Sequence, residues 1–137
     1  AADDTRFNLA YINLGTSCDV GASWALPRLV GMRQALEIAL LGQAMDASEA
    51  QRLGLVNRIV PVEQLGSEAH ALAIQLANGP TLAYGAMKRL MRASFDRNLK
   101  EQLDAEAEAF LACAGTQDFR AGVEAFFSKQ TPQFNGK

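Results

Sequence analysis

The chain is 137 residues long, 49% hydrophobic and 20% charged, with a formal net charge of −2. This composition is typical of a globular piece with one modest core, and no run of Lys or Arg suggests binding to nucleic acid or to an anionic membrane. No apolar stretch is long enough for a membrane helix, and the start of the chain shows no secretory signal. A cytoplasmic location is expected, and an organelle matrix is also compatible.

The first part of the chain predicts short strands alternating with helices. Near-alternation of apolar residues predicts a strand or extended segment over residues 5–13. Helices are predicted over residues 22–30 and 32–41, and Gly42 ends the second of them. Apolar side chains cover so much of residues 32–41 that we expect this helix to be buried on most sides.

Two further elements follow before the composition changes. Asp46 and Glu49 have the spacing of a capping box, which predicts a short helix that Gly54 closes. Residues 55–60 are rich in β-branched side chains and predict a strand, which Pro61 stops.

From residue 62 onward the pattern is helical. A helix is predicted over residues 62–77, and apolar stripes continue after Thr81 with little strand signal. Thr116 is a predicted cap for a last helix over residues 117–128. The apolar side chains of these helices must be buried in a core or against another chain; they include Tyr84, Met87, Met91, Phe110 and Phe126.

Asp19 is the most informative residue of the chain. It stands between Gly15 and Gly21 in an apolar run, directly before the helix predicted over residues 22–30. A carboxylate in this place either caps the helix by accepting backbone N–H bonds or takes part in proton transfer. Spacing alone leaves both interpretations open and favours the cap.

The cysteines point to no disulfide or metal site. Cys18 and Cys113 lie far apart and lack the spacing of a zinc site, so both are expected to be reduced thiols. His70, the single histidine, lies in another helical segment and gives little support to a Cys/His nucleophile.

A longer set of residues resembles the second half of the enoyl-CoA hydratase/isomerase (crotonase) family. The resemblance is carried by Leu14-Gly15, Asp19-Val20-Gly21, Leu26-Pro27-Arg28-Leu29-Val30-Gly31, Gly54-Leu55-Val56-Asn57 and Val60-Pro61, and by the closing signature Asp118, Gly122, Ala125-Phe126, Lys129, Pro132 and Phe134. It implies an α/β fold class, the C-terminal half of a crotonase-like (ClpP/crotonase) fold that is mostly helical with a few short strands.

The resemblance also implies a domain organisation. Residues 1–61 correspond to the C-terminal part of the crotonase core and residues 62–137 to the helical trimerisation region. Because Ala1 matches the interior of the family's usual sequence, we expect a fragment that lacks the oxyanion-hole loops and is inactive alone. A homotrimer or hexamer is the assembly expected.

The resemblance assigns the catalytic role to Asp19, where family isomerases carry an aspartate in an Asp-x-Gly setting. Walled by Leu14, Val20, Trp24 and an acyl chain, this carboxylate would be partly desolvated and a stronger base. Hydratases of the family carry a second glutamate at the place of Tyr11, whose phenol cannot activate water near neutral pH. Isomerisation of an unsaturated acyl-CoA is therefore expected over hydration.

Further residues are expected to contact the acyl-CoA substrate: Tyr11, Leu14, Gly15, Gly21, Trp24, Phe126 and Lys129. The resemblance implies that Phe126 and Lys129 reach the CoA of a neighbouring subunit, although Gln130 replaces the family's usual arginine. A simpler interpretation makes Lys129 a solvated helix end and Trp24 a packing residue. CoA enters only as part of the substrate, and no metal or redox cofactor is expected.

Other functions stay open from the sequence. An enoyl-CoA hydratase or a thioester hydrolase of the same family would differ by one or two residues. A non-catalytic oligomerisation module would fit the apolar helices. An RNA-binding member of the family would need a basic stripe, which the chain does not have.

Overall fold

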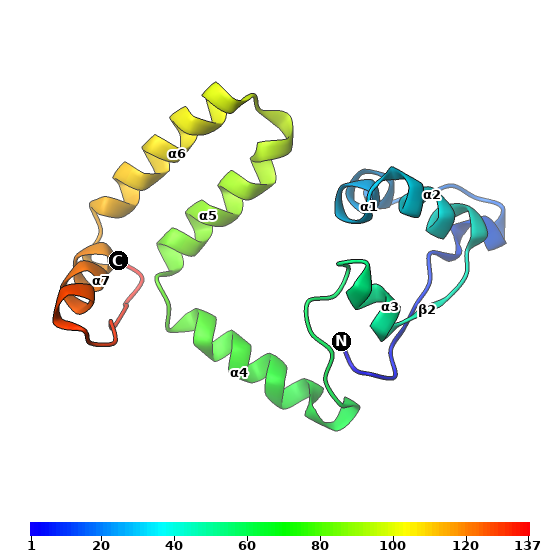
Figure 1. The fold of residues 1–137 in the computed structure, drawn as a ribbon, viewed down its shortest axis with the longest axis horizontal. Coiled ribbons are helices and arrows are strands. Elements are labelled where there is room, and N and C mark those ends of the chain that lie inside the picture. Colours follow the sequence, from blue (N-terminus) through cyan, green and yellow to red (C-terminus); the bar gives the residue numbers. More distant parts are fainter. The chain divides into compact units, whose positions relative to one another are not determined.

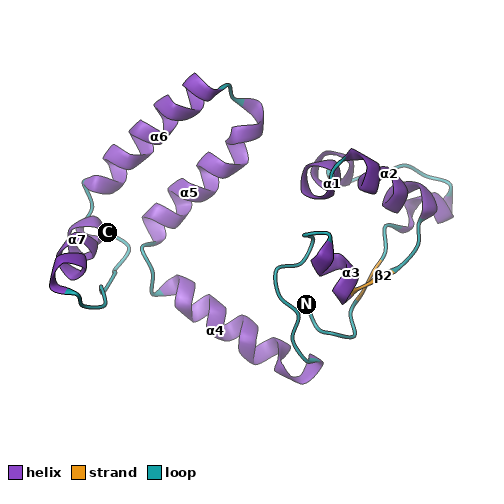
Figure 2. Cartoon of the chain, in the orientation of Figure 1, coloured by secondary structure: helices purple, strands orange, loops and turns teal.

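The computed structural model describes all 137 residues, and they form two compact units, Ala1–Ala69 and His70–Lys137. Helices dominate both units (Figure 1), and the only sheet is a pair of two-residue strands in the first unit (Figure 2). None of the helices has the length and apolar character that crossing a membrane requires.

The first unit packs three short α-helices and a small sheet around a minimal core. Its elements are β1 (Arg6–Phe7), a 3₁₀ helix (Ala10–Leu14), α1 (Ala22–Val30), α2 (Met32–Leu41), β2 (Met45–Asp46), α3 (Ala47–Arg52) and a second 3₁₀ helix (Val62–Gln64). Helix α2 packs against both α1 and the first 3₁₀ helix. The strands pair antiparallel, with Arg6 opposite Asp46. Apart from Ile38, the buried apolar residues of this unit are alanines.

The second unit is a helical hairpin with a third helix beside it. After α4 (Leu65–Ala77), which crosses the boundary between the units, the chain forms α5 (Thr81–Ala93), a 3₁₀ turn (Ser94–Asp96), α6 (Leu99–Ala114) and α7 (Gln117–Ser128). Helices α5 and α6 run side by side in opposite directions (Figure 1), and α7 contacts α6. Every residue of α4 is exposed.

Of the two predicted strands, the one over residues 5–13 is confirmed only at β1, and the one over residues 55–60 is wrong. Residues 5–13 form only the short β1 before the chain turns into a 3₁₀ helix, because the Gly15 N–H donates to Ile12 O and the Thr16 N–H to Tyr11 O. Residues 55–60 form no strand beyond a single parallel bridge from Val60 to Ala2. The N–H groups of Leu55 and Val56 both donate to Ala50 O in a turn after α3, so they are not available to pair with another strand.

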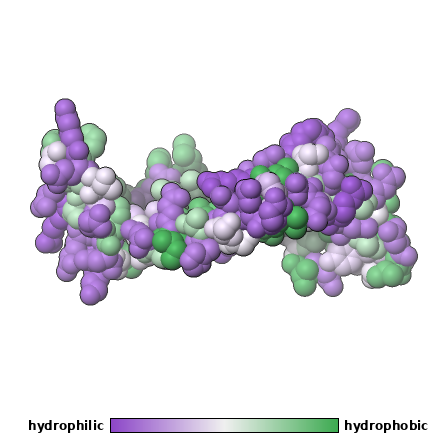
Figure 3. Space-filling view, turned by 90° about the horizontal axis from the view of Figure 1, so that it is seen from below, coloured by the Kyte–Doolittle hydropathy of each residue, from purple (hydrophilic) through white to green (hydrophobic).

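Burial of α2 on most sides is also wrong for this chain. Only Ala35 and Ile38 are buried in α2, while Leu36, Leu40 and Leu41 are at least half exposed. Similar apolar side chains lie open across both units and form the green areas of Figure 3. The broad apolar surface of this helix is therefore left uncovered by the rest of the chain.

The predicted helix ends are confirmed where they depend on local chemistry. Gly42 ends α2 in the left-handed region at φ +57°, and the Thr116 hydroxyl accepts the Phe119 N–H at the start of α7. A full capping box, which the sequence analysis missed, joins Asn98 and Glu101 at the start of α6. Its signal was the Asn-x-x-Glu spacing.

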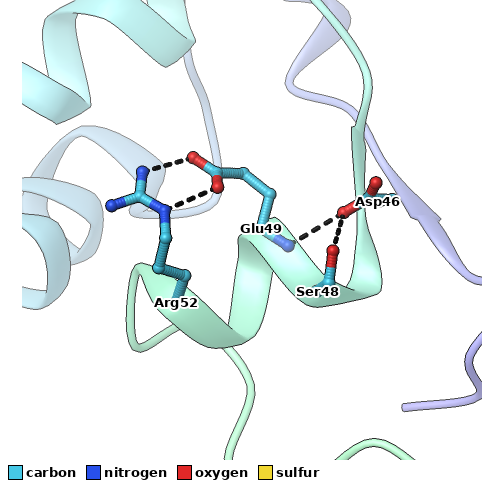
Figure 4. Close-up of polar contacts among 4 residues, drawn as sticks. All are labelled: Asp46, Ser48, Glu49 and Arg52. Atoms are coloured by element: carbon cyan, nitrogen blue, oxygen red, sulfur yellow. Dashed lines mark hydrogen bonds and ion pairs between the residues drawn. The ribbon is translucent and has the colours of Figure 1, made fainter.

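Asp46 caps α3 as predicted, but only half of the capping box forms (Figure 4). Its Oδ1 accepts the Glu49 N–H at 2.8 Å and the Ser48 hydroxyl at 2.7 Å. The Glu49 carboxylate turns instead to the Arg52 guanidinium, with two bonds of 2.5 and 2.7 Å. These contacts lower the pKa of Asp46, first through the Glu49 N–H and then through the Ser48 hydroxyl.

Asp118 ties the C-terminal tail to α7. Its side chain is buried, at 4% exposure, and accepts the N–H groups of Asn135 at 2.7 Å and Gly136 at 2.9 Å. Its own N–H donates to Lys137 O at 3.0 Å. The tail therefore follows α7 back toward its first turn.

We predict that Asp118→Ala releases this tail, because two backbone N–H groups lose a buried acceptor. The free energy of unfolding should fall by about 1–3 kcal/mol. Carboxypeptidase digestion followed by mass spectrometry should remove the last residues several-fold faster than in the wild type. Asp118→Asn, which keeps one acceptor oxygen, should be digested at a rate between those of the wild type and Asp118→Ala. Equal digestion rates of all three proteins would contradict the role of Asp118.

A second prediction concerns acid. Since the folded pKa of Asp46 is below its ordinary value of 3.8, the cap stabilises α3 fully above that value and is lost as the pH falls through the folded pKa. The Glu49 amide should lose its protection from hydrogen exchange over that range, measured by NMR. In Asp46→Asn, whose side chain caps without titrating, Glu49 should show no such transition; the same transition in both proteins would contradict the prediction.

Candidate functional site

The candidate site begins with the 3₁₀ helix Ala10–Leu14, which carries Tyr11. The helix ends at Gly15, whose left-handed φ of +68° lets the chain turn sharply toward α1. The side chain of Asn13 fixes the helix to the end of α2, donating from Nδ2 to Gly42 O at 3.1 Å. Tyr11 is thus anchored to a helical part of the unit, while Asp19 lies in the loop that follows.

Tyr11 and Asp19 come together across this turn. The phenolic Oη of Tyr11 donates a hydrogen bond of 2.5 Å to Oδ1 of Asp19. Asp19 does not cap α1: the N-cap is Gly21 at φ +83°, and no side chain accepts the first N–H groups of the helix. The capping interpretation is therefore wrong, and the carboxylate is engaged by a phenol.

The backbone beside Asp19 is strained. Val20 has a φ of +43°, in the left-handed region that β-branched residues rarely adopt, and its side chain is 94% exposed. Gly21 continues in the same region. No residue pattern indicates this conformation, because a valine is not the residue expected at a positive φ.

The electrostatics of the pair follow from this contact. The hydrogen bond to the Asp19 carboxylate is the largest cause that raises the pKa of Tyr11 above its ordinary value of 10.0, because it favours the protonated phenol. Burial raises this pKa further, and Cys18 contributes slightly. Tyr11 is therefore a hydrogen-bond donor throughout the neutral pH range.

The expected apolar wall around Asp19 is not provided by these residues. Asp19 itself is exposed, and its neighbours Leu14 and Val20 are 81% and 94% exposed. The hollows of the first unit lie elsewhere, including one of about 310 Å³ between α2, β2 and α3. Without an acyl chain, the residues expected to surround Asp19 therefore leave its carboxylate exposed to water.

Trp24 lies on α1, half exposed at 50%. The Arg28 guanidinium stacks over its ring at 4.0 Å, and Arg28 Nη1 donates to Trp24 O at 2.8 Å. This cation–π contact follows from the four-residue spacing along a helix, which the sequence analysis did not use. Trp24 is neither a core residue nor the wall of a closed pocket in this structure.

Phe126 and Lys129 belong to the second unit. Phe126 is exposed on α7 and stacks edge-on with Phe127, with ring centroids 5.6 Å apart. Lys129 ends α7 in the left-handed region at φ +55°, and its side chain is exposed. Phe126 lines a mostly apolar hollow of about 350 Å³ together with Phe119, Phe127 and Phe134, whereas Lys129 does not line it.

The chemistry available at the site is that of a carboxylate base. Oδ1 of Asp19 is occupied by the phenol, and its other oxygen accepts no hydrogen bond from the chain. Both cysteines are free thiols, and no three His, Cys, Asp or Glu side chains gather as metal ligands would. Of the residues expected at the site, the structure joins Tyr11 and Asp19 by a direct contact.

Residues 1–137 match the family model for enoyl-CoA hydratase/isomerase. The chain is 36% identical over 137 residues to the 1,2-epoxyphenylacetyl-CoA isomerase of Escherichia coli, covering all of this chain and 52% of that protein. It is 34% identical to the 2,3-dehydroadipyl-CoA hydratase of the same organism, covering all of this chain and 54% of the relative.

Solved structures confirm the expected fold. The enoyl-CoA hydratase/isomerase of Cupriavidus metallidurans superimposes with a TM-score of 0.93 at 36% identity, over 99% of this chain and 51% of that one. The chain thus spans about half the length of the relatives that it matches. Its mostly helical structure is the corresponding part of a crotonase fold, and the chain belongs to the enoyl-CoA hydratase/isomerase family.

Proposed function

We propose that this chain supplies the proton-transferring part of an enoyl-CoA isomerase acting on an unsaturated acyl-CoA thioester in fatty-acid or aromatic-acid degradation. The observation that carries the proposal is the Tyr11–Asp19 pair: the carboxylate is not used as a helix cap and keeps one oxygen open. Asp19 acts as the base that removes a proton from one carbon of the acyl chain and returns it to another. The double bond moves, and nothing else is added or lost.

The half of the family fold that this chain does not include has a specific role in the proposal. Removing a proton next to a thioester produces an enolate, which backbone N–H groups of an oxyanion hole stabilise. We assign that oxyanion hole, and the apolar cover that desolvates Asp19, to the half of the family fold outside this chain. No cofactor beyond the CoA of the substrate is needed, because a base and two hydrogen-bond donors suffice for the transfer.

Hydration is the second candidate, because one of the relatives described above is a hydratase. Activating water for addition to a double bond is the work of a carboxylate pair in the family's hydratases. This chain offers Tyr11 in place of the second carboxylate, and its phenol stays protonated at neutral pH. The pair therefore favours isomerisation.

The surface area supports assembly with further polypeptide. The chain exposes 10096 Å², whereas two separate globules of half its mass would expose about 8,400 Å² together. The excess of about 1,700 Å² is about twice the area of about 800 Å² that one partner contributes to a standard-size protein interface. We propose a homotrimer or hexamer in which α5, α6 and α7 take part and Phe126 and Lys129 contact CoA.

We also propose a cytoplasmic location, which the two free thiols of the chain, Cys18 and Cys113, support.

The catalytic role of Asp19 can be tested in a protein that joins this chain to the amino-terminal half of the Escherichia coli isomerase. We predict that Asp19→Asn lowers the rate of interconversion of cis-3- and trans-2-enoyl-CoA by about 10²- to 10⁴-fold. Absorbance follows the conjugated product, and mass spectrometry detects any water adduct. Asp4→Asn, an exposed aspartate in the same unit, should retain full activity.

The contrary outcomes are distinct. A water adduct that forms at an undiminished rate in Asp19→Asn would replace the isomerase proposal by a hydratase that does not use this carboxylate. Isomerisation that is unchanged in both variants would remove Asp19 from the mechanism.

Assembly and substrate binding are tested separately. We predict that the chain associates in sedimentation experiments and that Phe126→Glu together with Phe127→Glu weakens association at least tenfold, because charges replace two exposed aromatic rings. Arg120→Glu, an exposed change on the same helix, is the control. In the joined protein, acyl-CoA should bind in a titration; assembly without any thioester binding would favour a non-catalytic oligomerisation module.

A further inference from the structure

We propose that Tyr11 is a positioning residue for Asp19: its hydroxyl occupies Oδ1 and fixes the carboxylate, so that the second oxygen alone takes and returns the proton. The catalytic meaning of this inference rests on the proposed function. The hydrogen bond that carries it does not, since it is a property of the folded chain.

The geometry indicates that Tyr11 is the fixed partner of the pair and that it orients Asp19. Tyr11 lies on a 3₁₀ helix that packs against α2 and is tied to it by the bond from Asn13 to Gly42. The approach is close at this point, because a Cβ on Gly42 would lie 2.7 Å from Ile12 Cγ2. The Thr16 N–H also donates to Tyr11 O. The phenol therefore starts from an anchored backbone.

The side chain of Asp19 has no comparable anchor, although its backbone O accepts the Ala22 N–H at 2.9 Å. Asp19 lies in the loop between Gly15 and α1, its side chain is exposed, and its carboxylate accepts no backbone N–H of the helix. An exposed aspartate of this kind samples several rotamers, and the two carboxylate oxygens occupy different positions in each. The bond from Tyr11 selects one of them.

Fixing the carboxylate matters more for a proton shuttle than for a simple base. The same oxygen must stand within hydrogen-bond distance of two carbon atoms in succession, and small displacements lower such rates steeply. A phenol suits the task because it donates one bond and stays protonated at the pH at which the carboxylate is charged. The ring is half-buried, so its own position is restricted.

The first experiment measures the bond in the 137-residue chain without any substrate. The chain contains two tyrosines, so Tyr84→Phe leaves Tyr11 as the only phenol, and its ionisation is followed by ultraviolet absorbance. We expect Tyr11 to ionise above its ordinary value of 10.0 and Asp19→Asn to lower this midpoint. The other titrating neighbour is Cys18, and Cys18→Ser should shift the midpoint less. An unchanged midpoint in Asp19→Asn would overturn the proposal.

The second experiment measures the consequence in the joined protein. Tyr11→Phe keeps the ring and removes only the hydroxyl, and it should lower kcat by about 10- to 100-fold while KM stays within about twofold. A raised KM with unchanged kcat would overturn positioning and make Tyr11 a substrate contact. Unchanged kinetics would overturn it as well.

The two proposals fail in different ways. If Asp19→Asn leaves isomerisation unchanged while the Tyr11 titration responds to Asp19, the proposed function is wrong and the bond is structural only. If Asp19→Asn abolishes isomerisation while Tyr11→Phe is fully active, the proposed function stands and the positioning role of Tyr11 is wrong.

Discussion

Incomplete burial is the constraint on which the rest of this structure depends. The buried apolar residues are six alanines and Ile38, and no large side chain is completely enclosed. Helices of this length are marginal in water unless an apolar face packs against something. The helix α4, exposed over its whole length, shows the point most clearly. The chain therefore has the secondary structure of a crotonase fold without the contacts that would stabilise all of it.

The same constraint explains which features the sequence predicts well. Helix ends at Gly42, Asp46 and Thr116 are correct because a cap is a bond between neighbours in the chain. The strand predicted over residues 55–60 fails because a strand needs a partner edge, and only Ala2 offers one. The predicted burial of α2 fails likewise. A sequence pattern identifies the apolar face of a helix, but only the structure shows whether another element packs against that face.

The candidate site was predictable in its residues and not in its contacts. Tyr11 and Asp19 were both singled out, but spacing favoured a helix cap for Asp19, and only the structure shows that the Tyr11 hydroxyl bonds to its carboxylate. The strain at Val20 and the stacking of Arg28 on Trp24 were missed. A positive φ at valine contradicts local preference, so no pattern of residues predicts it.

An exposed base and an incomplete core then have one common explanation within the proposed function. A carboxylate becomes a stronger base when water is removed from it, and this chain leaves Asp19 exposed while Tyr11 holds it in place. In the proposed function, Tyr11 orients the Asp19 carboxylate, and contacts with other polypeptide or with the substrate remove water from it. In this proposal, contacts that cover the exposed Leu14 and Val20 would also remove water from the neighbouring Asp19, so the same contacts would serve both folding and catalysis.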